Sequence, residues 1–211
     1  MQLPRSVRRL MSAFEKLPGI GPKTAQRLSY YLLNVPQAQL DELSQAVAQL
    51  KRETQKCSIC YQIAETDPCP VCSDSQRDSS IICVVEQPLE VIAIEQTQQY
   101  HGVYHVLHGV LDPLNYIGPE ELYLAHLLKR ITTSLDTKPV KEIIMALNHD
   151  LEGEATVMYL KQEIDKLKQQ YPQLAELKIT RLAQGVPLGG ELEYLDQRTL
   201  SQALVGRQLL E

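Results

Sequence analysis

The sequence predicts an α/β fold, in which a mostly parallel sheet flanked by helices follows an N-terminal helical unit. Three observations lead to this prediction. Apolar residues recur at helical spacing in the first quarter of the chain, a short turn-rich segment holds four cysteines, and from residue 80 onward short apolar runs alternate with helical patterns. Strands that alternate with helices need crossover connections, which make the strands parallel and place helices on both faces of the sheet.

Three helices are predicted in residues 1–56. The first is indicated by apolar residues at helical spacing over residues 3–17. The segment LPGIGPK (17–23) then breaks the chain, and Pro22 suits the first turn of a second helix, which Pro36 stops. A third helix is marked by its apolar residues, which are Leu40, Leu43, Val47 and Leu50.

Four strands with helices between them are predicted in the remainder of the chain. The strands are the apolar runs 81–85, 104–109, 141–147 and 177–183. The helices between them are expected over residues 88–96, 119–135 and 154–170. The chain then closes with a Gly-rich loop at 185–194 and a last helix near Gln197–Leu209.

The composition is that of a soluble globular protein, with 44% hydrophobic and 22% charged residues. No apolar run approaches the roughly twenty residues that cross a bilayer. The N-terminal stretch has charges, but neither a long apolar core nor a small-residue cleavage site, so it does not resemble a signal peptide. We therefore expect a cytoplasmic protein that has no membrane partner.

Charge is distributed unevenly along the chain, although the net charge is −5. Residues 1–56 hold nine Lys/Arg and four Asp/Glu, whereas the remainder holds twelve Lys/Arg and twenty-two Asp/Glu. A basic first quarter on an acidic body indicates that a polyanion, if one binds, binds the N-terminal part. Charge alone does not separate this interpretation from a chance excess on a solvated surface.

Four of the five cysteines form two C-x-x-C pairs, with the spacing Cys57-x2-Cys60-x8-Cys69-x2-Cys72. Two intervening residues let a tight turn direct both sulfurs at one point, and two such turns complete a tetrahedron around Zn²⁺. A redox pair is the rival interpretation, but it needs one C-x-x-C near a βαβ unit. We therefore predict a closed, structural zinc site, and we interpret Cys83 as a small buried hydrophobe within a strand.

The segment between the first two helices carries a candidate DNA-binding hairpin. Gly19 and Gly21 permit close approach of a partner, and the following helix N-terminus attracts phosphate. Lys23 and Arg27 are four residues apart, on one face of that helix, and suit neighbouring phosphates. This pattern resembles a helix-hairpin-helix motif, and the alternative is an ordinary turn whose central isoleucine fills a core. The preceding helix adds the candidate contact Arg9, together with Arg5 and Arg8.

Acidic and amide side chains follow two of the predicted strands. Glu86 follows the first, and Asn148, Asp150 and Glu152 follow the third. The pattern resembles the Toprim fold, whose members hold Mg²⁺ with a Glu and an Asp-x-Asp pair, but Asn148 replaces the first Asp. Two interpretations remain open. These residues form an acidic cluster that binds Mg²⁺ weakly or binds a partner, or they form a loop of helix-capping residues.

In this order the motifs resemble the RecR family of bacterial recombination mediators. The resemblance implies a ring-like oligomer, a dimer or tetramer, that clamps single- and double-stranded DNA at the nucleoid without reading sequence. It also implies RecO and RecF as partners in loading RecA onto single strands coated by single-strand-binding protein. The family pattern commonly has Pro-Thr where this chain has His149 and Asp150. The segments that carry the resemblance are residues 17–28, the four cysteines, and residues 80–86, 104–114, 152–156 and 181–200.

Two classes of function follow. The first is a DNA clamp and loading scaffold that is not an enzyme, and the second is a Mg²⁺-dependent Toprim nuclease or topoisomerase relative that uses Glu86, Asp150 and Glu152. The replaced Asp and the lack of a tyrosine in a nucleophile context favour the scaffold. The expected regions are a helix-hairpin-helix region (1–56), a zinc motif (57–72), a Toprim-like domain (80–176) and a C-terminal strand, Gly-rich loop and helix (177–211).

Overall fold

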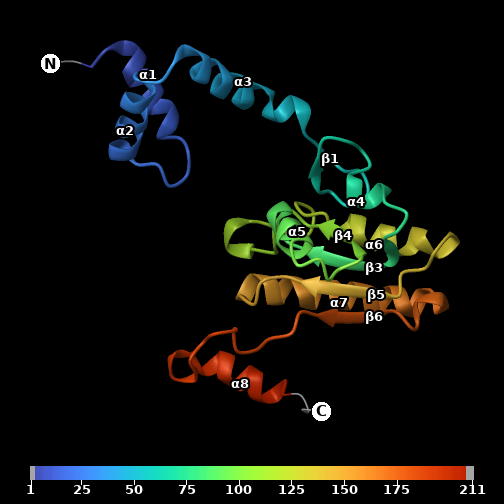
Figure 1. Cartoon of the computed structure of the whole chain (residues 1–211). Coiled ribbons are helices and arrows are strands. Elements are labelled where there is room, and N and C mark those ends of the chain that lie inside the picture. The colour runs from blue at the N-terminus through green and yellow to red at the C-terminus, as the bar shows by residue number, and fades with distance from the viewer. Residues whose placement is uncertain (1–2, 208–211) are drawn as a thin grey trace. The chain divides into compact units, whose positions relative to one another are not determined.

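The computed structural model describes residues 3–207 of the chain. They fall into two compact units, Met1–Thr54 and Gln55–Glu211 (Figure 1). The first unit is helical, and the second contains the cysteine segment, the sheet and the C-terminal helix. The division lies close to the composition change that the sequence shows near residue 56.

The first unit contains the three helices that the sequence predicts. They are α1 (Arg5–Phe14), α2 (Pro22–Leu32) and α3 (Gln37–Glu53). Pro22 occupies the first turn of α2, where its missing N–H costs no hydrogen bond. α1 packs on α2 and buries Val7, while Ala25 and Ser29 are the buried residues of α2.

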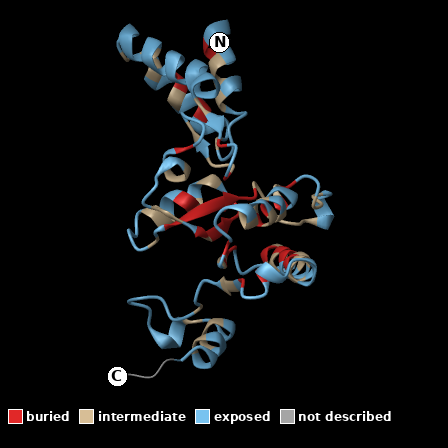
Figure 2. Cartoon of the chain, turned by 90° about the vertical axis from the view of Figure 1, so that its right-hand side faces the viewer, coloured by how far each residue is buried: buried red, intermediate tan, exposed pale blue. Residues whose placement is uncertain are grey.

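The third helix of this unit has an uncovered apolar side. Leu43, Val47 and Leu50 recur at helical spacing on α3, but their exposed fractions are 44%, 70% and 63%. No residue of α3 is buried, and Figure 2 shows the contrast with the buried sheet of the second unit. The helix is confirmed, but its apolar residues form a surface rather than a core.

The cysteine segment folds into more regular structure than the sequence predicts. β1 (Gln55–Lys56) pairs antiparallel with β2 (Ile63–Ala64), and the single turn α4 (Pro70–Ser73) follows the third cysteine. These elements are too short to hold a hydrophobic core of their own. The cysteines themselves therefore form the centre of this segment.

The second unit is built on a four-stranded sheet in which every neighbouring pair of strands is parallel. The strands are β3 (Asp78–Val85), β4 (Gly102–Val106), β5 (Glu142–Ala146) and β6 (Lys178–Arg181), in the order β4-β3-β5-β6. All four predicted strands are present. Because β6 pairs with β5, the strand near residue 180 belongs to the same sheet as residues 80–176.

Two apolar clusters fill the space between the sheet and its helices. α6 (Leu124–Thr133) and α7 (Leu151–Gln170) pack against one side of the sheet, and α5 (Pro88–Glu95) contributes to the other cluster. Alternate β3 residues enter the two clusters, as expected for a strand buried on both faces. The main cluster includes Ile82, Val84, Leu127, Ile131, Ile143, Leu160 and Ile164. The smaller one includes Cys83, Val85, Val91, Tyr104 and Val106.

Three predicted boundaries shift for local reasons. β3 begins at Asp78 because this residue pairs with Gly102 across an irregularity in the ladder. β4 ends at Val106, since the backbone turns at His108, which has a φ of 61°. α7 begins three residues before its predicted start because Asp150 caps it, accepting a hydrogen bond from the backbone N of Gly153.

Two other helices are shorter than predicted. α6 begins at Leu124 rather than near residue 119, because the carboxylate of Glu121 accepts the backbone N–H of Gly118 and closes a turn there. The last helix, α8 (Gln197–Val205), was predicted to reach residue 209, and its final two predicted residues lie outside the described part of the chain. Among the described residues, no helix combines the length and apolar character that crossing a membrane requires.

Candidate metal centre and nucleic-acid interface

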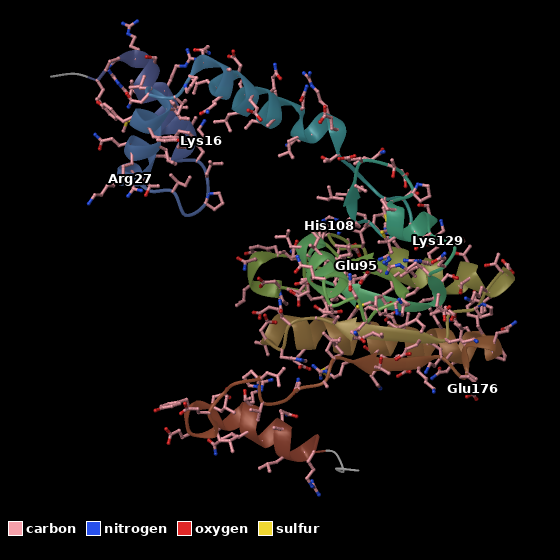
Figure 3. The ribbon with its side chains drawn as sticks, in the orientation of Figure 1. Lys16, Arg27, Glu95, His108, Lys129 and Glu176 are labelled. Atoms are coloured by element: carbon pink, nitrogen blue, oxygen red, sulfur yellow. The ribbon has the colours of Figure 1, made fainter. Side chains whose placement is uncertain are left out.

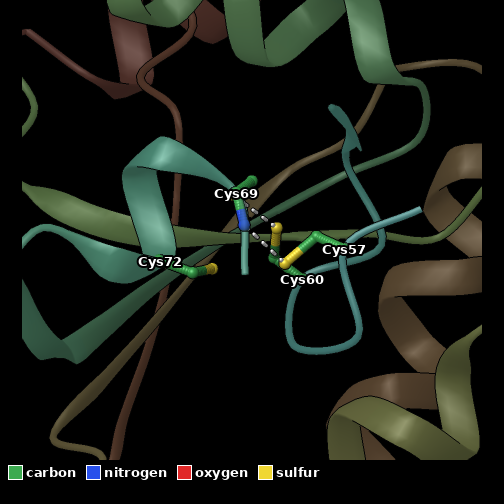
Figure 4. Close-up of side chains that lie close together, drawn as sticks. All are labelled: Cys57, Cys60, Cys69 and Cys72. Carbon is green, nitrogen blue, oxygen red and sulfur yellow. Dashed lines mark hydrogen bonds between the residues drawn. The ribbon is translucent and has the colours of Figure 1, made fainter. Parts of the chain in front are cut away.

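Four thiols from two turns of the second unit converge on one point (Figure 4). The Sγ atoms of Cys57, Cys60, Cys69 and Cys72 all lie within 4.8 Å of one another, and those of Cys60 and Cys69 are 3.5 Å apart. Sulfurs bound to one tetrahedral Zn²⁺ at about 2.3 Å stand about 3.8 Å from each other. Three of the cysteines are buried and Cys72 is half-buried. The cluster therefore fits one ion held by four thiolates.

Backbone hydrogen bonds shape the first of these turns. The N–H of Cys57 donates to the carbonyl of Gln62 at 2.8 Å, and the N–H of Tyr61 donates to the carbonyl of Cys57 at 2.9 Å. Tyr61 has a φ of 64°, in the left-handed region that reverses the chain. Asp67 then links the two turns, because its carboxylate accepts from both the N–H and the hydroxyl of Ser58. The two-residue spacing thus brings each sulfur pair inward, as predicted.

Burial and neighbouring thiols shift the pKa values of Cys60, Cys69 and Cys72. The pKa of Cys60 falls to about 6, chiefly because the thiol of Cys72 donates a hydrogen bond to it. The same hydrogen bond and burial raise the pKa of Cys72 well above its usual range, and burial raises that of Cys69 to about 11. A divalent cation among the sulfurs favours the thiolate form of all four. The donor set therefore suits a soft, thiolate-binding ion such as Zn²⁺.

The cysteine segment is hydrogen-bonded to the end of the edge strand β4 and to the residues that follow it. The N–H of Val106 donates to the carbonyl of Cys60 at 2.8 Å, and Nε2 of His108 donates to the carbonyl of Tyr61 at 2.7 Å. The ring of Tyr61 also stacks on that of Tyr123, with centroids 4.0 Å apart. Sequence reasoning missed these contacts because no local pattern joins residues that lie dozens of positions apart.

Glu86 and Asn148 meet at the carboxyl ends of β3 and β5, as the parallel sheet predicts. Glu86 is only 6% exposed. One of its carboxylate oxygens accepts the backbone N–H of Asn148 at 2.5 Å, and the other accepts the side-chain amide at 2.8 Å. Burial raises the pKa of Glu86, although the Asn148 hydrogen bonds oppose the rise. Asn148 is therefore a neutral donor that satisfies the buried carboxylate.

The other acidic residues of this edge lie at the start of α7. Asp150 is the N-cap, with its carboxylate 2.8 Å from the backbone N of Gly153. Glu152 lies in the first helical turn, where a negative charge interacts favourably with the helix dipole. Within residues 3–207, the four cysteines are the one group of three or more His, Cys, Asp or Glu side chains close enough to share an ion. The geometry of Asp150 and Glu152 matches the capping interpretation.

His149 belongs to a network that the sequence did not indicate. Its Nδ1 accepts from the guanidinium of Arg181 at 2.7 Å and from the amide of Gln184 at 2.8 Å. Arg181 also pairs with Glu154 at 2.6 Å and lowers the pKa of that carboxyl. His149 thus ties the loop after β5 to the end of β6, while Asp150 beside it caps α7.

The candidate DNA-binding hairpin lies between α1 and α2 in the first unit. Gly19 has a φ of 80°, and a Cβ added at Gly19 or Gly21 would meet no atom of the described residues within 4 Å, so this turn is open. Gly21 is the N-cap of α2 and offers no side-chain cap, which leaves N–H groups of the first turn of α2 available to a ligand. Lys23 and Arg27 are both exposed on α2. Ile20 is half-buried, so the turn also contributes to packing.

None of the candidate DNA-binding cations is neutralised by a carboxylate in the described part of the chain. Every ion pair among residues 3–207 lies in the second unit. Arg9 is exposed on α1, as Lys23 and Arg27 are on α2, and Figure 3 labels Arg27. The first unit therefore presents unpaired positive charge beside an open helix N-terminus.

Comparisons with known proteins agree with this geometry. Three family models match the chain: "RecR, helix-hairpin-helix" over residues 7–51, "Toprim domain" over residues 80–183, and "RecR, C-terminal" over residues 185–208. The curated proteins named Recombination protein RecR from Bifidobacterium adolescentis and from Bifidobacterium longum (strain DJO10A) are similar over almost their whole length. Each is 46% identical to this chain over 203 residues, which are 96% of this chain and 96% of the relative.

Proposed function

This chain belongs to the RecR family of recombination proteins, and we propose that it acts in recombinational DNA repair as a DNA-binding mediator without a catalytic centre of its own. In this proposal the first unit holds DNA, the cysteines hold a structural zinc ion, and several chains assemble into a clamp. The clamp works with RecO and RecF to load RecA onto single-stranded DNA. The protein accordingly acts at the nucleoid, in the cytoplasm.

The main support for the proposed DNA binding is the open hairpin that leads into α2. Gly19 and Gly21 leave the backbone accessible, and the uncapped helix start supplies N–H donors and a positive dipole end. Lys23 and Arg27 lie on the same helix, one turn apart, without carboxylate partners among the described residues. Such contacts hold the phosphate backbone and do not read bases.

The test is a double substitution, Lys23→Ala with Arg27→Ala, compared with Lys51→Ala with Arg52→Ala at the exposed end of α3. Both variants lose two positive charges from the same unit. We expect the hairpin variant to lose detectable DNA binding near physiological salt, because non-specific affinity comes from the phosphate contacts. The α3 variant should bind as the wild type does. Wild-type affinity in the hairpin variant would show that this segment is only a turn.

The rival function is a Mg²⁺-dependent Toprim enzyme. It requires Glu86 to be free for a metal ion, whereas both of its carboxylate oxygens accept hydrogen bonds from Asn148. Supercoiled DNA incubated with the protein and Mg²⁺ or Mn²⁺ should therefore remain intact. Metal-dependent nicking by the wild type, abolished in Glu86→Ala, would support the enzyme.

The role proposed for zinc is structural. All four candidate ligands come from the chain, so no coordination position is open to water or substrate. The segment that carries them is short of apolar residues, and the ion supplies the stability that a core would otherwise give. This proposal assigns the ion no chemical step.

Two surfaces support assembly and partner binding. The uncovered side of α3, with Leu43, Val47 and Leu50, is the kind of exposed apolar surface that marks a protein interface. It supports an oligomer, a dimer or tetramer. The acidic start of α7, where Asp150 is exposed and Glu152 is half-buried beside the buried Glu86, suits a partner with a basic surface, and we assign RecO or RecF to it.

A further inference from the structure

A second set of basic residues lies outside the hairpin, along one side of α1 and just past its end. Arg5, Arg8, Arg9 and Lys16, with Ser12 and Ala13 between them, line a shallow surface hollow of about 520 Å³. We call the four cations the α1 stripe, and Figure 3 labels one member, Lys16. All four are exposed, and within residues 3–207 none pairs with a carboxylate.

The close spacing of these cations destabilises α1. Arg5 and Arg9 are four residues apart and Arg5 and Arg8 three apart, so like charges face each other on one side. Both pairs also lie in the first half of α1, where the dipole disfavours positive charge. α1 has no acidic residue in its first turn and no side-chain cap at Pro4. Within residues 3–207, Arg8 is the one member of the stripe whose side chain donates a hydrogen bond, to the backbone oxygen of Leu3 at 3.1 Å.

We propose that the α1 stripe is a second DNA-binding surface, which contacts the phosphodiester backbone in addition to the hairpin. A local arrangement that lowers the stability of its own helix is typical of a functional site. An anion at this position relieves the repulsion among the cations and interacts favourably with the N-terminal end of the helix dipole. The inference rests on the proposed DNA binding and extends it to residues beyond the hairpin.

The shape of the surface favours a nucleic acid over an acidic protein. Arg5 and Arg9 are four residues apart, about 6 Å along the axis of α1, and Lys16 lies two residues past the end of the helix. Each strand of a duplex presents a phosphate about every 3.4 Å along its axis. A line of cations therefore matches a line of several phosphates. A protein partner needs an apolar centre for its interface, whereas the hollow is lined by basic side chains, Ser12 and Ala13.

The test compares the salt dependence of duplex binding in Arg5→Gln with Arg9→Gln and in the matched control, Lys51→Gln with Arg52→Gln. Both variants remove two exposed cations from a helix of the same unit. For the stripe variant we expect the slope of log Kobs against log salt to become shallower by at least about 1.8, since each lost phosphate contact removes about 0.9. The control should keep the wild-type slope. The melting temperature of the stripe variant should not fall, because the substitutions remove repulsion.

An unchanged slope in the stripe variant would overturn the inference. If the oligomer mass also fell at that unchanged slope, the stripe would be assigned to a protein contact instead. The hairpin variant Lys23→Ala with Arg27→Ala separates this inference from the proposed function. If it loses DNA binding while the stripe variant keeps its slope, the function stands and the inference fails. If it binds as the wild type while the stripe variant has a shallower slope, the stripe stands and the hairpin assignment fails.

Discussion

His105 lies in β4 without exposed surface, and its Nε2 donates a hydrogen bond to the backbone oxygen of Tyr123 at 2.9 Å. Its other ring nitrogen, Nδ1, has no hydrogen-bond partner within the described residues. Burial lowers the pKa of His105 to about 3, and the charge of Arg130 adds to the effect. The folded protein therefore holds this ring neutral, although an unfolded chain protonates it near pH 6.5.

This difference predicts that acid destabilises the fold through His105. Below pH 6.5 the unfolded chain binds a proton that the folded protein excludes, so the unfolding free energy falls as pH decreases toward 3. Between pH 8 and pH 5 the loss from this residue is about 2 kcal/mol. Denaturant unfolding at several pH values checks it, with His105→Gln as the comparison, because glutamine keeps a donor for Tyr123 but does not titrate.

The difference in pH dependence between wild type and His105→Gln isolates the residue from other titrating groups, including the cysteines, which both proteins share. Parallel curves for the two proteins would mean that the buried ring accepts its proton without cost. A variant that has lost most of its stability at pH 8 would not answer the question, and His105→Asn then serves as the second comparison.

At the scale of elements, the cysteine segment and strand β4 depend on each other. β4 is an edge strand, and its end is covered where the N–H of Val106 donates to the carbonyl of Cys60. An unpaired strand edge invites pairing with other chains. An ion that fixes the cysteine turns therefore also protects this end of the sheet.

We expect one zinc ion per chain and a loss of stability in Cys57→Ser. Removing one thiolate opens the site, and each kcal/mol lost lowers the melting temperature of a chain of this size by about 2–4 °C. Elemental analysis and thermal melting, followed by light scattering for aggregation, measure the effect. The matched control is Cys83→Ala, which removes a buried thiol of β3 that lies outside the cluster and should retain the zinc. Zinc-free wild-type protein with an unchanged melting curve would contradict the prediction.

At the scale of the whole molecule, a basic region of 56 residues is joined to an acidic remainder. The hairpin and the α1 stripe together hold six cations, while the rest of the chain repels DNA. Linking several such sites in one oligomer raises the effective affinity without new contacts, by ~10²-fold or more where geometry allows. The exposed apolar side of α3 is consistent with such linkage.

We expect the protein to be an oligomer in solution and its DNA binding to depend steeply on salt. If all six cations of one chain contacted phosphates, the slope of log Kobs against log salt on duplex DNA would have a magnitude of about 5. An oligomer that engages several chains should therefore show a steeper slope. Light scattering with and without DNA should give a mass of at least two chains. A monomer that binds DNA tightly near physiological salt, with a slope below this limit, would contradict the clamp.

The sequence alone predicted the parts of the protein that depend on neighbouring residues. Apolar periodicity predicted the helices and the four parallel strands, and the spacing of Cys57, Cys60, Cys69 and Cys72 predicted their convergence. The glycines and Pro22 predicted the hairpin and the start of α2. These patterns are local, because a helix, a turn or a strand is selected by side chains within a few positions of one another.

Tertiary structure decided which distant side chains meet. Asn148 satisfies Glu86 across 62 positions, His149 accepts from Arg181 across 32, and His108 donates to Tyr61 across 47. The first two contacts depend on strand order and register, which bring the carboxyl ends of strands together whatever their separation in the chain. The third depends on the packing of the cysteine segment against the end of β4. The sequence placed acidic residues at this edge of the sheet, but the hydrogen bonds from Asn148 that occupy both carboxylate oxygens of Glu86 follow from the pairing of β3 with β5.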